Sequence, residues 1–219
     1  RFTCVEINSS FYRPHRPATY ARWAASTPPG FRFAVKFPKL VTHELRLRDA
    51  EEPIAQFAEQ VAELGEKLGV VLVQLPPSLA FDPGTAGSFF QQLRENVRAP
   101  VACEPRHASW FSVEGDAMLR RHHIARVAAD PSIVPAAAEP GGHGDLAYFR
   151  WHGSPHMYYS AYDHRALRDL AVKVATAKAR EAWCIFDNTA AGAAFENALS
   201  LSSIVGDAEG AHESTAVLR

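Results

Sequence analysis

The sequence predicts an α/β fold, a TIM-type (β/α) barrel, and three observations lead to that prediction. Segments of high β propensity alternate along the 219 residues with segments of helical periodicity, which is typical of βαβ units and a parallel sheet. Seven strands can be recognised, one fewer than a complete barrel has. On six of them, polar side chains occupy alternate positions near the carboxyl end, so they share one face of the strand. A barrel interior accepts such charges, whereas an open sheet covered by helices on both faces does not.

The expected strands are short runs in which alternation decides which residues share a face. In the second strand, Phe31, Phe33 and Val35 form the apolar face that would pack on helices. In the fourth strand, regular pairing should end at Pro105, which has no amide hydrogen to donate. The seven strands are expected within residues 3–7, 31–36, 70–75, 101–104, 125–128, 146–151 and 183–186.

Helices are expected between the strands. Residues 54–68 carry apolar side chains at steps of three and four, and Gly69 stops the pattern. Asp82 followed by Pro83 is the pattern of an N-cap and a first-turn proline, so a helix should run from there to about residue 94. Further helices are expected within residues 19–26, 116–122, 167–174 and 195–204, and a long loop within residues 131–144.

Composition limits the classes of partner. The 23 basic and 24 acidic residues leave a net charge of −1, so no overall field attracts a nucleic acid or an anionic membrane. No apolar run reaches the length of a membrane span. We therefore expect no membrane partner and disfavour nucleic acid. Because no shift in composition divides the chain, residues 1–205 are expected to form one domain, followed by a polar tail over residues 206–219.

The cysteines point to a compartment. Cys4, Cys103 and Cys184 are far apart and lie in apolar, strand-like runs. This pattern is typical of buried thiols in a reducing environment and not of disulfides or zinc ligands. With no export signal recognised, the expected location is the cytoplasm. The sequence indicates no particular cofactor and does not set the oligomeric state.

Residues 101–110 contain the highest concentration of candidate functional side chains. Their strand ends in Glu104, Arg106 and His107, an acid, a fixed cation and an imidazole within four positions. Glu104 and Arg106 share a face. Glu6 on the first strand could join Glu104 as a pair of carboxylates, one acting as a base and the other as an acid. The alternative is that a neighbouring arginine or lysine holds each carboxylate in a salt bridge.

Three cations, Lys36, Arg106 and Arg150, are expected on the same face of their strands and at the same level along them. Together they could clamp a phosphate or carboxylate, with the arginines giving bidentate contacts and the lysine a point charge. Because buried cations are costly without a partner, the alternative is that the carboxylates are that partner. Asn8 and Gln74 share the same parity, where they could orient a substrate hydroxyl or only satisfy the interior.

Three histidines, His43, His107 and His152, directly follow strands. We take His107 and His152 as candidates for proton transfer, which needs no metal. With Glu104 and Asp130 the histidines could also form a divalent-metal site, but no pair has the close spacing of a metal motif. We therefore predict no metal, with His43 and Asp130 as substrate contacts.

Six segments are distinctive as a set: VEINSSFYRP (5–14), TPPGFRFAVKFPKLVTH (27–43), LGVVLVQLPPSL (68–79), CEPRHASWF (103–111), YFRWHG (148–153) and IFDNTAAGAAFENALSL (185–201). In this order they resemble the YecE-like family of uncharacterised TIM-barrel proteins. The resemblance implies the barrel but no established reaction. Family members usually begin with a further strand carrying a Gly-Ser-Gly-Trp type motif, so the first strand and helix of the barrel are expected to be missing. Family members often have two asparagines where this chain has Asp187 and Asn188, and Asn188 is taken as a candidate substrate contact.

Two functions remain open at this point. The first is a cytosolic enzyme that acts on a small phosphate- or carboxylate-bearing substrate by acid–base chemistry, as a hydrolase, isomerase or lyase, since barrel architecture does not choose among these reactions. The second is a non-catalytic protein that binds a metabolite or a nucleic-acid phosphate. A chain without the first barrel unit could also be inactive.

Overall fold

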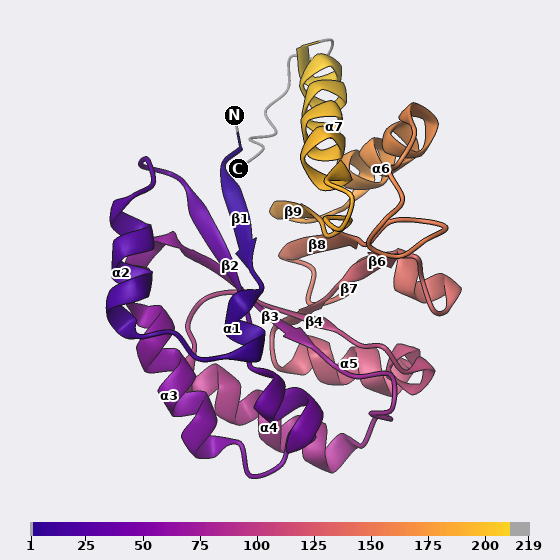
Figure 1. Ribbon diagram of the computed structural model, residues 1–219. Coiled ribbons are helices and arrows are strands. Elements are labelled where there is room, and N and C mark those ends of the chain that lie inside the picture. Colours follow the sequence, from indigo (N-terminus) through magenta and orange to yellow (C-terminus); the bar gives the residue numbers. More distant parts are fainter. Residues whose placement is uncertain (1, 211–219) are drawn as a thin grey trace.

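The computed structural model describes residues 2–210 and contains a mostly parallel sheet surrounded by helices (Figure 1). In this range one sheet has the strand order β1, β2, β3, β4, β5, β7, and a second has the order β6, β8, β9. All neighbouring strands are parallel except β5 and β7. The strands are β1 (Cys4–Ile7), β2 (Arg32–Lys36), β3 (Leu68–Gln74), β4 (Val101–Glu104), β5 (Ile124–Arg126), β6 (Ala128–Asp130), β7 (Gly141–Gly142), β8 (Leu146–Trp151) and β9 (Glu181–Phe186).

The two sheets are parts of one strand order. β5 and β6 are separated only by Val127; β5 pairs with β4, and β6 pairs with β8. The amide of Val127 donates to the carbonyl of Cys103 at 2.8 Å, so hydrogen bonding along β4 continues across the break. The seven predicted strands are therefore all present in the described residues, with the fifth divided in two.

The prediction of a long loop over residues 131–144 is wrong in part. Residues Pro135–Ala138 form a 3-10 turn, and β7 pairs with β5. Two long-range contacts hold this segment: Asp116 Oδ1 accepts the amide of Gly142 at 2.8 Å, and Arg126 Nη1 donates to the carbonyl of Ala136 at 2.6 Å. Neither contact is visible in the local sequence, which is rich in proline, alanine and glycine.

All six predicted helices are present. In α4, Asp82 accepts the amide of Thr85 at 2.8 Å and Pro83 opens the helix, as expected. α7 continues past Gly206, so the predicted tail does not begin there; residues 211–219 lie outside the described part. The short α1 and a π-helical turn (Leu40–Glu44) were not predicted. The helices are α1 (Ser9–Tyr12), α2 (Pro17–Ala25), α3 (Glu51–Ala62), α4 (Pro83–Asn96), α5 (Val113–Arg121), α6 (His164–Thr176) and α7 (Ala193–Gly210).

The helices cover the outer face of the sheet. Figure 1 shows α2 to α5 around β1 to β5, with α6 and α7 beside β8 and β9. Phe33 and Val35 of β2 share a buried cluster with Ile54 of α3, and Phe149 of β8 shares another with Leu170 of α6. Within residues 2–210, no helix combines the length and the apolar composition that a membrane crossing requires.

The inner face of the strands is divided along its length. Near the amino ends it is apolar, because Ala34, Leu72, Ala102, Tyr148 and Trp183 belong to one buried cluster. Two residues further toward the carboxyl end, most of these strands carry a charged or amide side chain on the same face. Since a polar group buried without a partner is costly, this second half must pair internally. The candidate site therefore lies inside the sheet, at the strand carboxyl ends.

The sheet is open between its first and last strands. In the described residues no ladder joins β1 to β9, and a cavity of about 440 Å³ lies between them, lined by residues of β1, β9 and α7. Val5 and Phe195 beside this cavity are 44% and 61% exposed. Residues 2–210 thus have an α/β fold with a mostly parallel sheet, and no closed barrel is found among them.

Packing of the inner apolar layer yields a stability prediction. A Cβ on Gly69 of β3 would lie 2.4 Å from Cζ2 of Trp183, a buried side chain, so Gly69→Ala should overpack the interior and lower the free energy of unfolding by about 1–3 kcal/mol. Gly144→Ala is the matched control, because a Cβ there meets no atom within 4 Å. Urea unfolding of both variants measures the difference. Equal stability of the two variants would show that the layer is loosely packed.

Candidate functional site

Arg150 on β8 is the centre of the candidate site, and its side chain is fully buried. Its Nη2 donates to Glu6 Oε1 at 2.7 Å and its Nε donates to Glu6 Oε2 at 3.1 Å. Nη1 donates to Glu104 Oε2 at 2.6 Å, and Nη2 also donates to Asp187 Oδ2 at 3.0 Å. One cation thus connects carboxylates from β1, from β4 and from the residue after β9.

His152 extends this network. Its Nδ1 lies 3.1 Å from Asp187 Oδ2, and its Nε2 lies 3.0 Å from both Glu104 Oε1 and Arg106 Nη2. A neutral imidazole can accept a hydrogen bond at one ring nitrogen, whereas a protonated imidazole donates from both. A proton added at Nε2 would therefore exchange a bond from Arg106 for a bond to Glu104. The partners for both states are already in position around the ring.

The cations hold two carboxylates in the ionised form. Burial alone would raise the pKa of Glu104, but Arg150, His152 and Arg106 hold that pKa well below its usual value. Burial likewise opposes ionisation of Asp187, and its pKa is lowered by the hydrogen bond with His152 and by the charge of Arg150. The carboxylates in turn raise the pKa of the buried Arg150. The network is therefore made of mutually stabilised charges.

Lys36, at the end of β2, is a cation of a different kind. It is 8% exposed, and its Nζ lies 4.2 Å from the centroid of the Phe11 ring, in a cation–π contact. No ion pair joins Lys36 to a carboxylate within residues 2–210. Burial and then the charge of Arg150 lower the pKa of Lys36 to about 8, although Glu104 and Glu6 act in the opposite direction. Its charge is thus the least compensated in the site.

Three further predicted contacts lie around this network. Gln74 Nε2 donates to Glu104 Oε2 at 2.9 Å. The side-chain oxygen of Asn8 is buried without a hydrogen-bond partner in the described residues. The ring of His43 lies 5.1 Å from the Phe11 ring, and burial and the charge of Lys36 lower the pKa of His43.

The other three predicted residues make contacts elsewhere. His107 Nδ1 lies 2.8 Å from Ser109 Oγ, beyond the end of β4. Asp130 Oδ2 accepts from the Tyr162 hydroxyl at 2.6 Å. Asn188 Nδ2 donates to the Ser160 carbonyl and to Asn197 Oδ1. Among the described contacts, none links these three side chains to Arg150.

Two residues of the network were missed by the sequence analysis. Asp187 was considered only as a departure from a family pattern, yet it contacts both Arg150 and His152. Tyr148 donates to Glu6 Oε2 at 2.8 Å, and burial and Glu6 raise its pKa. Both were detectable in principle, because they share the inward parity of their strands.

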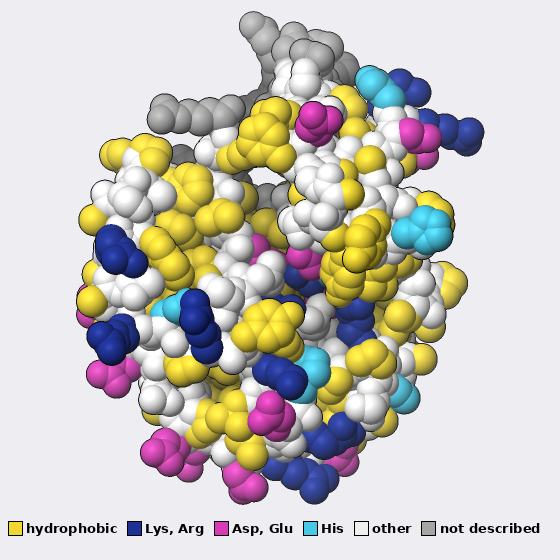
Figure 2. Space-filling model, in the orientation of Figure 1, with side chains coloured by type: hydrophobic (Ala, Val, Ile, Leu, Met, Phe, Trp, Pro, Cys, Tyr) yellow, Lys and Arg dark blue, Asp and Glu magenta, His cyan; other side chains and the backbone are white. Residues whose placement is uncertain are grey.

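The site has a route to solvent. Glu6, Asn8 and Asp187 line the cavity of about 440 Å³ between β1 and β9, a volume in the range of small-molecule sites. Figure 2 shows acidic and basic side chains together in the hollow in the middle of this face. In the part of the chain that is described, no three or more His, Cys, Asp or Glu side chains are grouped to hold a metal ion.

A family model described as "Protein of unknown function DUF72" matches residues 1–217. The chain belongs to the DUF72 family. It is similar to the UPF0759 protein YecE of Escherichia coli K12, with 33% identity over 144 residues, which are 62% of this chain and 52% of that protein. The YecE protein of Escherichia coli O157:H7 is 33% identical over 75 residues, which are 34% of this chain and 28% of that protein. This DUF72 chain therefore spans about half the length, or less, of these relatives. The predicted resemblance to the YecE-like family is confirmed.

Solved structures of DUF72 proteins have a similar fold. A protein from Enterococcus faecalis V583 superimposes with a TM-score of 0.81 at 24% identity, over 93% of this chain and 85% of that one. A protein from Thermotoga maritima MSB8 superimposes with a TM-score of 0.78 at 30% identity, over 94% of this chain and 85% of that one. These relatives establish the arrangement of the elements, and their names state no reaction.

Acid sensitivity of this DUF72 protein should depend on Glu104. A carboxyl group whose pKa is lowered by folding contributes stability above its unfolded pKa, near 4.5, and loses that contribution as the pH falls through the folded pKa. Glu104→Gln should cost on the order of 3–5 kcal/mol at pH 7, because it leaves buried cations short of a partner. It should also flatten the fall in stability below pH of about 4.5.

Urea unfolding from pH 7 downward measures both effects. Glu59→Gln removes an exposed carboxylate of α3 and is the control. If Glu104→Gln and Glu59→Gln gave the same stability and the same slope with pH, the network would not stabilise the fold.

Proposed function

We propose that this DUF72 protein is an enzyme that acts on a small anionic substrate, carrying a phosphate or a carboxylate, by acid–base chemistry at the strand carboxyl ends. The observation that carries the proposal is that the cations of the site are unequally paired with carboxylates. Arg150 is surrounded by three carboxylates, while Lys36 is buried at the same level with no carboxylate partner in the described part of the chain. An anion is the partner that such a lysine lacks.

The proposed roles follow from exposure and charge. Lys36 and the partly exposed Arg106 would hold the anionic group. The fully buried Arg150 would act as a positioning residue, because its donors are already occupied by Glu6, Glu104 and Asp187. This revises the direct anion contact that the sequence suggested for Arg150.

His152 is the proposed proton carrier. It lies between Glu104 and Asp187, each within hydrogen-bond distance of one ring nitrogen, as in a general acid or base oriented by a third group. Glu104 is held ionised and would act by stabilising charge. Glu6, which lines the cavity, is the other candidate for proton transfer. Hydrolysis, isomerisation and elimination would all use these groups.

The fold and location proposed for this enzyme are those of a cytoplasmic TIM-type barrel. Seven parallel strands in chain order, with helices outside and charges inside, support the barrel, and β1 and β9 would border its open position. Cys4, Cys103 and Cys184 are free thiols, which supports a reducing compartment.

Turnover is the direct test. The chain is incubated with a panel of phosphate monoesters, sugar phosphates and hydroxy and keto acids, with and without divalent metal, and products are measured by mass spectrometry. A product formed by the wild type should be lost in Lys36→Met and His152→Asn and kept in Lys178→Met, which removes an exposed lysine. A product formed equally well by all variants would place the chemistry elsewhere.

The second candidate is a protein that binds the same anion without turnover. It is favoured by the low pKa values of Glu104 and Asp187, which leave two acids of the site ionised near neutral pH. A metabolite fits this reading better than a nucleic-acid phosphate, because the net charge is −1. Binding by the wild type with no product from any member of the panel would support this candidate and exclude the enzyme.

The pH dependence of anion binding tests Lys36 in either case. Because its pKa is about 8, Lys36 loses its charge as the pH rises from 7 to 9. Sulfate, whose own charge is constant in this range, should therefore bind more weakly at pH 9 than at pH 7. Lys36→Arg, which stays charged, should remove this dependence. Calorimetric titration measures both proteins, and an unchanged affinity of the wild type would show that Lys36 does not hold the anion.

A further inference from the structure

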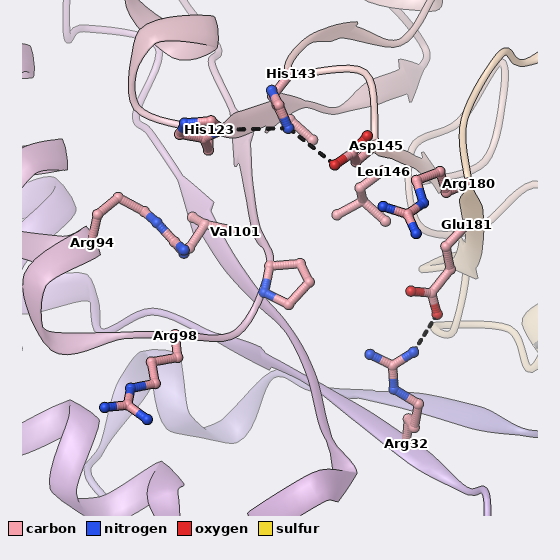
Figure 3. Close-up of a pocket in the computed structure, with 12 residues that line it drawn as sticks. Arg32, Arg94, Arg98, Val101, His123, His143, Asp145, Leu146, Arg180 and Glu181 are labelled. Carbon is pink, nitrogen blue, oxygen red and sulfur yellow. Dashed lines mark hydrogen bonds and ion pairs between the residues drawn. The ribbon is translucent and has the colours of Figure 1, made fainter.

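A second cavity, of about 630 Å³, lies at the opposite, amino-terminal ends of the strands (Figure 3). It is lined by Arg32, the first residue of β2, by Val101, the first residue of β4, and by Arg180, the residue before β9. β2 separates this cavity from the candidate site, because Arg32 and Lys36 are four residues, or about 13 Å, apart along an extended strand. The cavity is thus a separate feature of the molecule.

Basic side chains dominate the lining. Four arginines (Arg32, Arg94, Arg98 and Arg180) and two histidines (His123 and His143) border the cavity, against the two carboxylates of Asp145 and Glu181. In a chain whose net charge is −1, this is a local excess of positive charge. The cavity therefore has the electrostatic character of an anion site.

The carboxylates do not neutralise this excess. Glu181 is held by Arg32 at 2.5 Å and by Trp183 Nε1 at 3.0 Å. Asp145 is mostly exposed and faces His143 at 3.3 Å. Among residues 2–210, neither Arg94 nor Arg180 forms an ion pair with a carboxylate.

Two of the guanidinium groups that form no ion pair in the described residues, those of Arg94 and Arg180, point into the cavity. Figure 3 shows Arg94 and Arg180 extending toward its middle from opposite sides, whereas Arg98 extends away. Arg94 is fixed by a hydrogen bond to the Ala99 carbonyl at 2.7 Å, and burial lowers its pKa, so its charge is partly removed from water. Two separated guanidinium groups suit an anion with more than one charged centre.

The two histidines form the third side. Their rings lie 4.6 Å apart, with His123 Nδ1 3.5 Å from His143 Nε2. His143 Nε2 is also the atom that faces Asp145, so the pair is held in place. Imidazole N–H groups are donors to phosphate oxygens, and this pair adds them at a position between the two arginines in Figure 3.

We propose that this cavity binds an oligophosphate, the phosphate chain of a nucleoside di- or triphosphate or an inorganic polyphosphate, between Arg94 and Arg180. Because Arg94 and Arg180 extend from opposite sides of the cavity, we expect a chain of phosphates to contact both guanidinium groups and a single phosphate to contact one. The inference is independent of the proposed function, because it uses other residues at the other end of the strands.

Calorimetric titration with tripolyphosphate, ATP and orthophosphate tests the inference. Tripolyphosphate should bind the wild type more tightly than orthophosphate. Arg180→Gln and Arg94→Gln should each weaken binding by about 10-fold or more, as expected for loss of a charge-assisted hydrogen bond. Arg165→Gln, which removes an exposed arginine of α6, should leave the affinity unchanged. Lys36→Met is titrated alongside, to separate binding in this cavity from binding at the strand carboxyl ends. Circular dichroism of each variant confirms that it is folded.

Equal affinities for tripolyphosphate and ATP would assign recognition to the phosphate chain, and tighter binding of ATP would assign part of it to the nucleoside. Absence of tripolyphosphate binding at millimolar concentration, equal binding of orthophosphate, or equal losses in Arg165→Gln and Arg180→Gln would overturn the proposal. Loss in Lys36→Met alone would place the anion at the strand carboxyl ends and overturn it as well.

Discussion

The buried ion cluster around Arg150 is the constraint on which the rest of the interior depends. Burying a charge is costly, and removing one partner of a buried pair leaves that cost uncompensated. Here one guanidinium joins carboxylates from β1, from β4 and from the end of β9, and its own strand is β8. These segments are far apart in the sequence, so the cluster helps to specify which strands face each other across the interior. Lys36 lies at the same level with no carboxylate partner among residues 2–210.

The sequence predicted seven strands, six helices and which side chains face inward, but not which side chains pair with each other. Alternation alone placed Glu104, Arg106 and Arg150 on the inner face, because side-chain direction in a strand is a local property. Which carboxylate meets which cation depends on register and on the curvature of the sheet, so the salt-bridge alternative could not be separated from direct anion contact. The end of α7 was predicted wrongly for another reason. One glycine costs a helix only about 1 kcal/mol, so Gly206 does not stop the helix.

The same strands carry two polar regions with an apolar layer between them. Trp183 and Tyr148 stack at 6.1 Å inside the sheet, and Gly69 gives the indole its space. On the amino-terminal side lies the arginine-lined cavity, and on the carboxyl-terminal side lies the Arg150 cluster. The layer separates the two polar regions from each other. A ligand at one end is thereby separated from a ligand at the other.

The carboxylates occupy the donors of Arg150, and we propose that an incoming anion therefore binds Lys36. A crystal structure of the chain soaked with tungstate, a phosphate-like dianion with a strong anomalous signal, tests this claim most directly. We expect an anomalous peak beside Lys36 and Arg106, with Arg150 still hydrogen-bonded to Glu6 and Glu104. Density that bridges Arg150 after it has left the carboxylates, or no peak at the strand carboxyl ends, would contradict it.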